Sequence, residues 1–300
     1  MKKLNLTGTD VDEAVDRILT YKKSFTWRYF FAVFCIVLVW LVVIISALIP
    51  ILPNDWGYDY TDPFSDEYFT KSVIVMCLFI LIPITILLVR MTKLHLYLYK
   101  ILLDDCEPRK FIDVVDRLVK ERYFRKCYVN AVGTYYIAAS AYEKDYEKAM
   151  EHIELMRSKS KLKMFRKICM FYQGCVLADT GRVEKAQKCL DKLKEMVGTK
   201  TGNSRIAKAD RARIIDLEGV IAYAKKDYER AASLYNEAMK TFNNNISRIV
   251  LTYGCGNAAY NLGNYTEALK CYSEALEIKP DAKLVFMDDL REKIDEISGL

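Results

Sequence analysis

The feature that most constrains this sequence is a run of 20 residues without a charged side chain, Phe30–Ile49. A helix rises about 1.5 Å per residue, so the run would extend about 30 Å, the thickness of a bilayer's hydrocarbon core. Fifteen of its residues are Leu, Ile, Val or Phe, and each favours insertion by roughly 0.3–0.6 kcal/mol. A signal peptide followed by a core helix is the alternative, but the preceding segment is long and partly acidic. The run therefore predicts a membrane span at residues 30–49.

A second uncharged run, Ser72–Val89, has 18 residues and contains Pro83. Proline is tolerated in membrane helices, usually with a kink. Aromatic residues of the kind found at membrane interfaces flank the first run: Trp27, Tyr29, Trp56, Tyr58 and Tyr60. The sequence therefore predicts a two-helix transmembrane hairpin over residues 29–90, with spans at 30–49 and 72–89 joined by a loop at 50–71.

The distribution of bases predicts the orientation of this hairpin. Bases precede the first span and follow the second, whereas the loop contains only one, Lys71. Because Lys and Arg are enriched on the cytoplasmic side, both termini are expected in the cytoplasm of a cell membrane and the loop outside. The loop is acidic but lacks the ligand spacing of a calcium site, which favours a solvated linker. The low-glycine composition, rich in Lys and Tyr, suits a bacterium with an AT-rich genome.

The N-terminal segment, residues 1–28, has the pattern of an amphipathic helix. Thr9 is a candidate N-cap. Apolar residues then recur at helical spacing at Val11, Val15, Ile18 and Leu19. Two alternatives remain for this apolar face, which either packs on the domain that follows or lies on the inner membrane surface.

Charge and motifs exclude several classes of function. Bases exceed acids by 45 to 39 over the whole chain, and after the second span the two signs are interspersed, unlike a nucleic-acid-binding stripe. The nine cysteines have no zinc spacing and are typical of free thiols in a reducing compartment. We find no nucleophile–base motif, phosphate loop or metal motif. We therefore expect no enzymatic activity, no catalytic residue, no cofactor and no metal.

Four segments of the remaining chain share a pattern of small and aromatic residues. Three of them place a glycine twelve residues before an alanine, and a fourth, degenerate segment has Ile137 where the glycine is expected. The matching positions are Gly174 and Ala186, Gly219 and Ala231, Gly256 and Ala268, with Tyr146 and Ala149 in the degenerate segment. This pattern resembles the tetratricopeptide repeat (TPR), a helical hairpin of 34 residues that occurs in tandem. The clearest segment is Thr252–Pro280.

The resemblance implies an all-α fold, with the transmembrane hairpin followed by a TPR-like solenoid at residues 91–280. The clearest repeats are expected at about 167–196, 212–242 and 249–280, and a polar-backed capping helix at 281–300. Successive repeat alanines are 37, 45 and 37 residues apart, and the largest spacing predicts an exposed loop at Gly198–Ser204. The second span is expected to continue as one helix to about Leu103, and Pro108 to begin its partner helix. That helix would bury Ile112, Val115, Leu118 and Val119.

In this family the first helices of the repeats line a concave groove that takes peptides. The repeat alignment places ten side chains there: Phe171, Tyr172, Asp179, Arg213, Asp216, Tyr223, Tyr253, Asn257, Tyr260 and Asn261. Asn can hydrogen-bond a peptide backbone, and Tyr provides rigid contact area. For Tyr253 and Tyr260, packing between repeats is the alternative.

Together these features predict a membrane-anchored TPR scaffold or adaptor that recruits a protein or peptide on the cytoplasmic face. A different hypothesis is a membrane signalling or sensing protein that couples the acidic outer loop to the repeat domain. The expected partners are a protein or peptide and the lipid bilayer, without nucleic acid. The identity of the partner and the oligomeric state are left open by the sequence.

Overall fold

The computed structural model describes residues 4–48, 66–121, 132–198 and 204–299. All regular secondary structure in these ranges is α-helical, with no strand, as the all-α prediction requires. The chain divides into two compact units. The first is mainly residues 16–96, and the second comprises residues 5–15 and 97–300.

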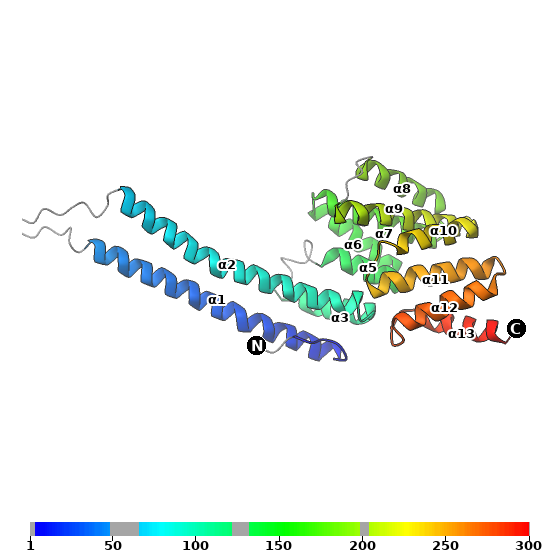
Figure 1. The fold of residues 1–300 in the computed structure, drawn as a ribbon, viewed down its shortest axis with the longest axis horizontal. Coiled ribbons are helices and arrows are strands. Elements are labelled where there is room, and N and C mark those ends of the chain that lie inside the picture. The colour runs from blue at the N-terminus through cyan, green and yellow to red at the C-terminus, as the bar shows by residue number, and fades with distance from the viewer. Residues whose placement is uncertain (1–3, 49–65, 122–131, 199–203, 300) are drawn as a thin grey trace, which may run out of the picture. The chain divides into compact units, whose positions relative to one another are not determined.

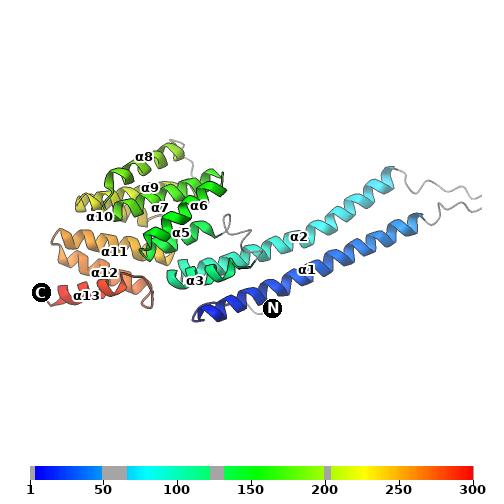
Figure 2. The ribbon, with the colours of Figure 1, turned by 180° about the vertical axis from the view of Figure 1, so that it is seen from behind.

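Two long helices make up most of the first unit, α1 (Val11–Leu48) and α2 (Asp66–Leu103). They run antiparallel to each other (Figures 1 and 2). The expected boundary at residue 28 is not a break, because one helix contains both the N-terminal segment and the first predicted span. α2 begins at Asp66, inside the predicted loop at 50–71, and the rest of that loop lies outside the described residues.

One helix is long and apolar enough to cross a membrane among the residues that the structure describes, Val11–Trp40. Between Trp27 and Val39 many of its large apolar side chains are exposed, with Trp27, Phe30 and Val39 each at least 65% exposed. Water would oppose the exposure of so many neighbouring apolar groups, whereas lipid would not. The second predicted span, residues 72–89, is not identified as such, and the two-span hairpin is not confirmed.

The chain leaves α2 and begins α3 (Pro108–Leu118) as predicted. α2 ends at Leu103, and Pro108 occupies the first turn of α3, where its missing N–H costs nothing. Ile112, Val115 and Leu118 are buried as expected. Val119 lies beyond the helix and is half-buried.

The N-cap of α1 is Asp10 and not Thr9. The Asp10 Oδ1 accepts a hydrogen bond from the Glu13 backbone N–H at 2.7 Å, and the Thr9 hydroxyl donates to the Leu6 carbonyl at 2.7 Å. Both residue types cap helices, so the pattern alone could not choose between adjacent positions.

Residues 5–15 pack with the helices of the second unit. The Thr7 hydroxyl donates to Asp105 Oδ2 at 3.1 Å, and the Lys110 Nζ donates to the Leu6 carbonyl at 3.1 Å. An ion pair also joins Asp12 to Arg117. Residues 5–15 therefore pack on the domain that follows, whereas Ile18 and Leu19 of the predicted apolar face belong to the first unit.

Four helical hairpins follow in the second unit. In each hairpin the two helices pack on one another, and α7 also packs on both α5 and α9. This is the nearest-neighbour packing of a helical solenoid (Figure 1). The hairpins are α5 (Gly133–Tyr142) with α6 (Tyr146–Lys159), α7 (Lys163–Asp179) with α8 (Val183–Val197), α9 (Arg205–Ala224) with α10 (Tyr228–Met239), and α11 (Asn245–Asn261) with α12 (Tyr265–Ile278).

The first helices of the three clearest repeats begin earlier than expected, at residues 163, 205 and 245 rather than 167, 212 and 249. The repeat pattern marks the packed centre of each hairpin, and the first turns extend beyond it. The expected loop at 198–204 does separate α8 from α9, but residues 199–203 lie outside the described ranges.

The glycine of the repeat pattern allows close packing between helices. A Cβ added to Gly256 would lie 2.5 Å from Cε1 of Tyr272, and one added to Gly219 would lie 2.9 Å from Cδ1 of Tyr235. Real atoms do not approach so closely, so each tyrosine ring occupies the volume that a larger residue would need.

The C-terminal helix, α13 (Met287–Ser298), is shorter than the predicted 281–300. Leu284, Met287, Leu290 and Ile297 are buried, and Leu284 lies in the irregular segment before the helix. Ile294 is half-buried. α13 packs on α12, as a terminal helix of a solenoid does.

Candidate functional site

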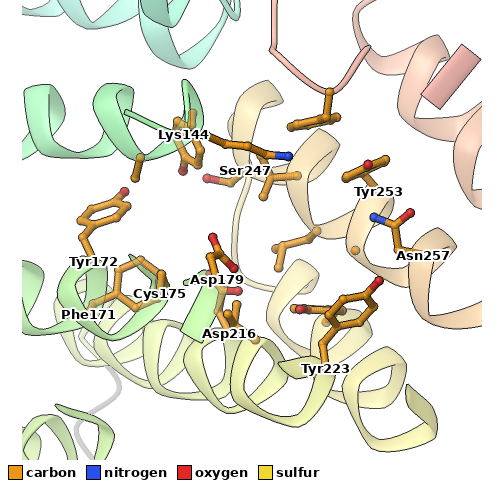
Figure 3. A pocket seen from close by; sticks show the side chains of 18 of the residues that line it. Lys144, Phe171, Tyr172, Cys175, Asp179, Asp216, Tyr223, Ser247, Tyr253 and Asn257 are labelled. Carbon is orange, nitrogen blue, oxygen red and sulfur yellow. The ribbon is translucent and has the colours of Figure 1, made fainter. Parts of the chain in front are cut away.

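A cavity of about 450 Å³ opens on the first helices of the four hairpins. Its walls come from α5, α7, α9 and α11, with additions from α6, α10 and the α13 region (Figure 3). This size falls in the range that accommodates small ligands or a few side chains. The lining combines aromatic rings, two carboxylates, two lysines and an amide.

Seven of the ten predicted groove residues line this one cavity. They are Phe171, Tyr172, Asp179, Asp216, Tyr223, Tyr253 and Asn257. They derive from three different repeats, so the stacking of the hairpins brings together residues that are up to 86 positions apart in the sequence. Their role in peptide binding remains a prediction.

The other three predicted residues do not line the cavity, because each is engaged elsewhere. The guanidinium of Arg213 pairs with Asp210 at 3.1 Å. The Tyr260 hydroxyl donates to Glu296 Oε1 at 2.8 Å, and the Asn261 side chain donates to the Tyr223 hydroxyl at 3.1 Å. For Tyr260 this hydrogen bond joins α11 to α13.

Aromatic side chains form much of the wall. Phe171 and Tyr172 meet edge to face at 4.8 Å between ring centroids, and Tyr142 approaches Tyr172 at 6.5 Å. Tyr253 stacks on Phe286 at 4.2 Å. Burial raises the pKa of Tyr142 to about 12 and that of Tyr172 further above its usual value. These phenols are therefore neutral at physiological pH and can both donate and accept hydrogen bonds.

Two carboxylates, Asp179 at the end of α7 and Asp216 on α9, point into the same part of the cavity (Figure 3). We call this pair the acidic subsite. The Tyr146 hydroxyl donates to Asp179 Oδ2 at 3.2 Å. Among the described residues none forms a hydrogen bond or ion pair with the Asp216 carboxylate.

The surroundings of the acidic subsite favour the protonated form of both groups. Burial, reinforced by the like charge of Asp179, raises the pKa of Asp216 to about 7, and Arg213 opposes this only in part. Burial also raises the pKa of Asp179, against the Tyr146 hydrogen bond and the charge of Lys144. Two carboxylates in a weakly solvated site disfavour ionisation of each other.

At the other end of the cavity, α13 inserts the ammonium group of Lys293. Its Nζ donates to Asn257 Oδ1 at 2.9 Å and pairs with Asp289 at 3.0 Å. The same ammonium lies over the rings of Tyr253 and Tyr272, at 5.6 and 5.9 Å from their centroids. Asn257 Oδ1 also accepts a hydrogen bond from the Tyr272 hydroxyl at 2.8 Å. The Asn257 amide, which was predicted to hydrogen-bond a peptide backbone, thus already accepts two hydrogen bonds from within the chain.

Several lining residues were not predicted from the sequence. They are Tyr142, Lys144, Tyr146, Cys175, Ser247, Phe286 and Lys293, with some apolar neighbours. Tyr142, Lys144 and Tyr146 belong to the degenerate first hairpin, whose Tyr146 was a usable signal. Phe286 and Lys293 lie outside every repeat, and no local pattern relates them to the cavity.

The residues that the structure describes contain no group of three or more His, Cys, Asp or Glu side chains that could hold a metal ion. Comparison with known protein families shows that the model of the tetratricopeptide repeat matches residues 252–282. These residues run from α11 to the segment just after α12. No curated protein matches the chain. A repeat of this kind indicates a surface for protein–protein interaction. The chain therefore contains a tetratricopeptide repeat at residues 252–282.

Proposed function

We propose that this protein is a membrane-anchored, non-enzymatic scaffold that recruits a protein partner through the cavity. The observation that carries the proposal is that consecutive hairpins direct aromatic and polar side chains into one open cavity. Solenoids use such surfaces, formed by several repeats at once, to hold extended segments of other proteins.

The anchor is proposed to be the hairpin of two spans, 30–49 and 72–89, with both termini in the cytoplasm of a bacterial cell. The exposed apolar side chains of α1 support this, as do those of α2, where Ile82 and Leu88 are 59% and 61% exposed. The bases that flank both spans, and their near absence from the loop, support the orientation.

The segment bound in the cavity is proposed to be an extended peptide. Seven of the predicted groove residues lie on its wall, and Tyr side chains there lose little entropy on binding because they have few rotatable bonds. Because the Asn257 amide oxygen is held by Lys293, we expect the peptide's hydrogen bonds to come mainly from other residues of the cavity.

Site-specific photo-crosslinking in the full-length protein tests the proposal. A photoreactive phenylalanine analogue replaces Tyr223, inside the cavity, or Glu237, which lies exposed on α10. Irradiation of intact cells should yield a crosslinked partner from position 223, and mass spectrometry should identify the same partner from a second cavity position, Tyr253.

The probe at position 237 is the control for random collisions. Crosslinks of the same kind and amount from positions 223 and 237 would contradict a role for the cavity. Failure of positions 223 and 253 to crosslink any protein, with the chain intact and in the membrane fraction, would also contradict it.

A further inference from the structure

The acidic subsite contains an ionisable group that the fold leaves unsatisfied. Asp216 is half-buried, its carboxyl group points into the cavity, and no described residue pairs with it (Figure 3). A carboxylate that is largely removed from water and has no partner is costly, and proteins normally supply a hydrogen bond or a cation. A cation from outside the chain could occupy this position.

The charged neighbours of Asp216 do not supply that cation. Arg213, on the same helix, is held by Asp210, which also pairs with Lys167 at 2.5 Å. The charge of Lys144, in the turn between α5 and α6, is directed at Asp179, whose pKa it lowers.

The remaining titratable neighbours of Asp216 come from α5, α7 and α10. They are Tyr142, Cys175 and Tyr235, and burial raises the pKa of each above its usual value. They are therefore neutral at physiological pH, and they add no positive charge to the subsite.

The aromatic wall next to the subsite suits the rest of a long basic side chain. Phe171 and Tyr172 of α7 and Tyr223 of α9 line the same cavity as the two carboxylates. Aromatic faces attract cations and pack against the methylene stem of Lys or Arg. The protein already uses this chemistry, because the ammonium of Lys293 lies over three tyrosine rings at the other end of the cavity.

We propose that the acidic subsite binds a lysine or arginine side chain of the partner peptide, with the cationic group between Asp179 and Asp216 and the stem against the aromatic wall. This inference rests on the proposed function, since the ligand is a peptide in the same cavity. It makes the site selective for basic segments and unfavourable for acidic ones, because an acidic side chain would add a third negative charge.

Retention of defined peptide pools by the full-length protein in detergent micelles tests the inference. The probes are fluorescent octapeptides blocked at both ends, with one central residue fixed as Arg, Lys, Gln or Glu and the other positions randomised among uncharged residues. At pH 8 and physiological salt, the Arg or Lys pool should be retained about tenfold more than the Gln pool, and the Glu pool least.

Three variants connect this preference to the subsite. Asp216→Asn and Asp179→Asn should each remove most of the preference for basic pools, and Asp216→Glu should keep it within about threefold, since the charge remains. Glu237→Gln removes one negative charge from the exposed side of α10 and should bind like the unmodified protein. Thermal melts establish that each variant is folded.

The outcomes separate the inference from the proposed function. Equal retention of the Gln and basic pools, or an undiminished basic preference in Asp216→Asn, would overturn the inference and leave a peptide-binding cavity in place. Retention of no pool above the level of empty micelles would overturn both.

Discussion

At the residue scale, the Asp216 carboxyl departs strongly from its ordinary acidity. Its pKa is raised to about 7 by burial and by the neighbouring Asp179. An acid whose pKa is higher in the folded than in the unfolded state binds more protons when folded. Its contribution to stability is therefore favourable at low pH and is lost as the pH rises from about 4 to about 7.

Asp216→Asn should for this reason stabilise the protein in a pH-dependent way. One pKa unit corresponds to about 1.4 kcal/mol, so we expect a gain of the order of 1 kcal/mol or more at pH 8 and little gain at pH 4. Thermal unfolding at pH 4, 6 and 8 measures it, with Glu237→Gln as the control for a general charge effect. A difference in Tm that does not grow with pH would show that ionisation of the Asp216 carboxyl does not destabilise the folded protein.

Close packing between Gly256 and Tyr272 makes a second prediction at this scale. Gly256→Ala places a methyl group where the Tyr272 ring lies, and forcing extra volume into a packed core costs about 1–3 kcal/mol. Denaturant unfolding should therefore show a lower midpoint. The exposed substitution Glu237→Ala should shift stability by no more than about 0.5 kcal/mol, and an equally small effect of Gly256→Ala would mean that the ring can move aside.

At the element scale, the turns inside the hairpins are built alike but with different residues. Lys144, Gly181, Lys226 and Gly263 all have a positive φ, between 56° and 74°. In three of the turns the next residue caps the second helix, as Asp145, Asp227 and Asn264 do through their side chains. The left-handed residue lets the backbone reverse, and glycine adopts this conformation without a steric penalty.

Lys226→Gly should accordingly stabilise the hairpin of α9 and α10. A non-glycine residue in the left-handed region costs roughly 1–2 kcal/mol, and we expect about 1 kcal/mol to be recovered, less the added entropy of the unfolded chain. Lys225→Gly is the matched control, because it removes the same charge one residue earlier, where φ is −83°. That variant should be neutral or destabilising. Equal Tm values for Lys226→Gly and Lys225→Gly would argue against backbone strain at Lys226.

At the scale of the whole molecule, the chain contains surfaces that suit different solvents. The second unit has extensive internal cores, such as the cluster around Leu190, Leu193 and Leu217. In the most apolar window of Val11–Trp40, only 6% of the residues are buried. Folding in water buries apolar surface, so this difference between the two parts supports the proposed membrane anchor.

Epitope accessibility tests the predicted orientation. A tag inserted between Gly57 and Tyr58 should bind antibody on intact cells, or on cells whose outer layers have been removed. A tag after Leu300 should bind only after the membrane is permeabilised. The control is the same C-terminally tagged chain, measured before and after permeabilisation. Labelling of the C-terminal tag on intact cells would reverse the orientation, and recovery of the chain in the soluble fraction would remove the anchor.

Local patterns were sufficient to predict much of the fold. The all-α class, the end of α2 near Leu103, the start of α3 at Pro108 and the buried Ile112, Val115 and Leu118 follow from periodicity and from the backbone limits of proline. The small residues at 174, 219 and 256 indicated the hairpin packing, because only short side chains allow helices to approach so closely. Boundaries were less accurate, as the cap at Asp10 and the start of α13 show, because several adjacent residues can end or cap a helix.

The sequence by itself determined seven of the residues on the cavity wall, since the face of a helix on which a residue lies follows from spacing within that helix. Only the tertiary structure decided which of them remain available. Arg213 is held by Asp210, Asn257 is held by Lys293 from a helix outside the repeats, and Asp216 has no hydrogen-bond or ion-pair partner in the described part of the chain. These outcomes depend on contacts between residues distant in the chain, and the energy of a buried charge is set by all the groups around it and not by its neighbours in sequence.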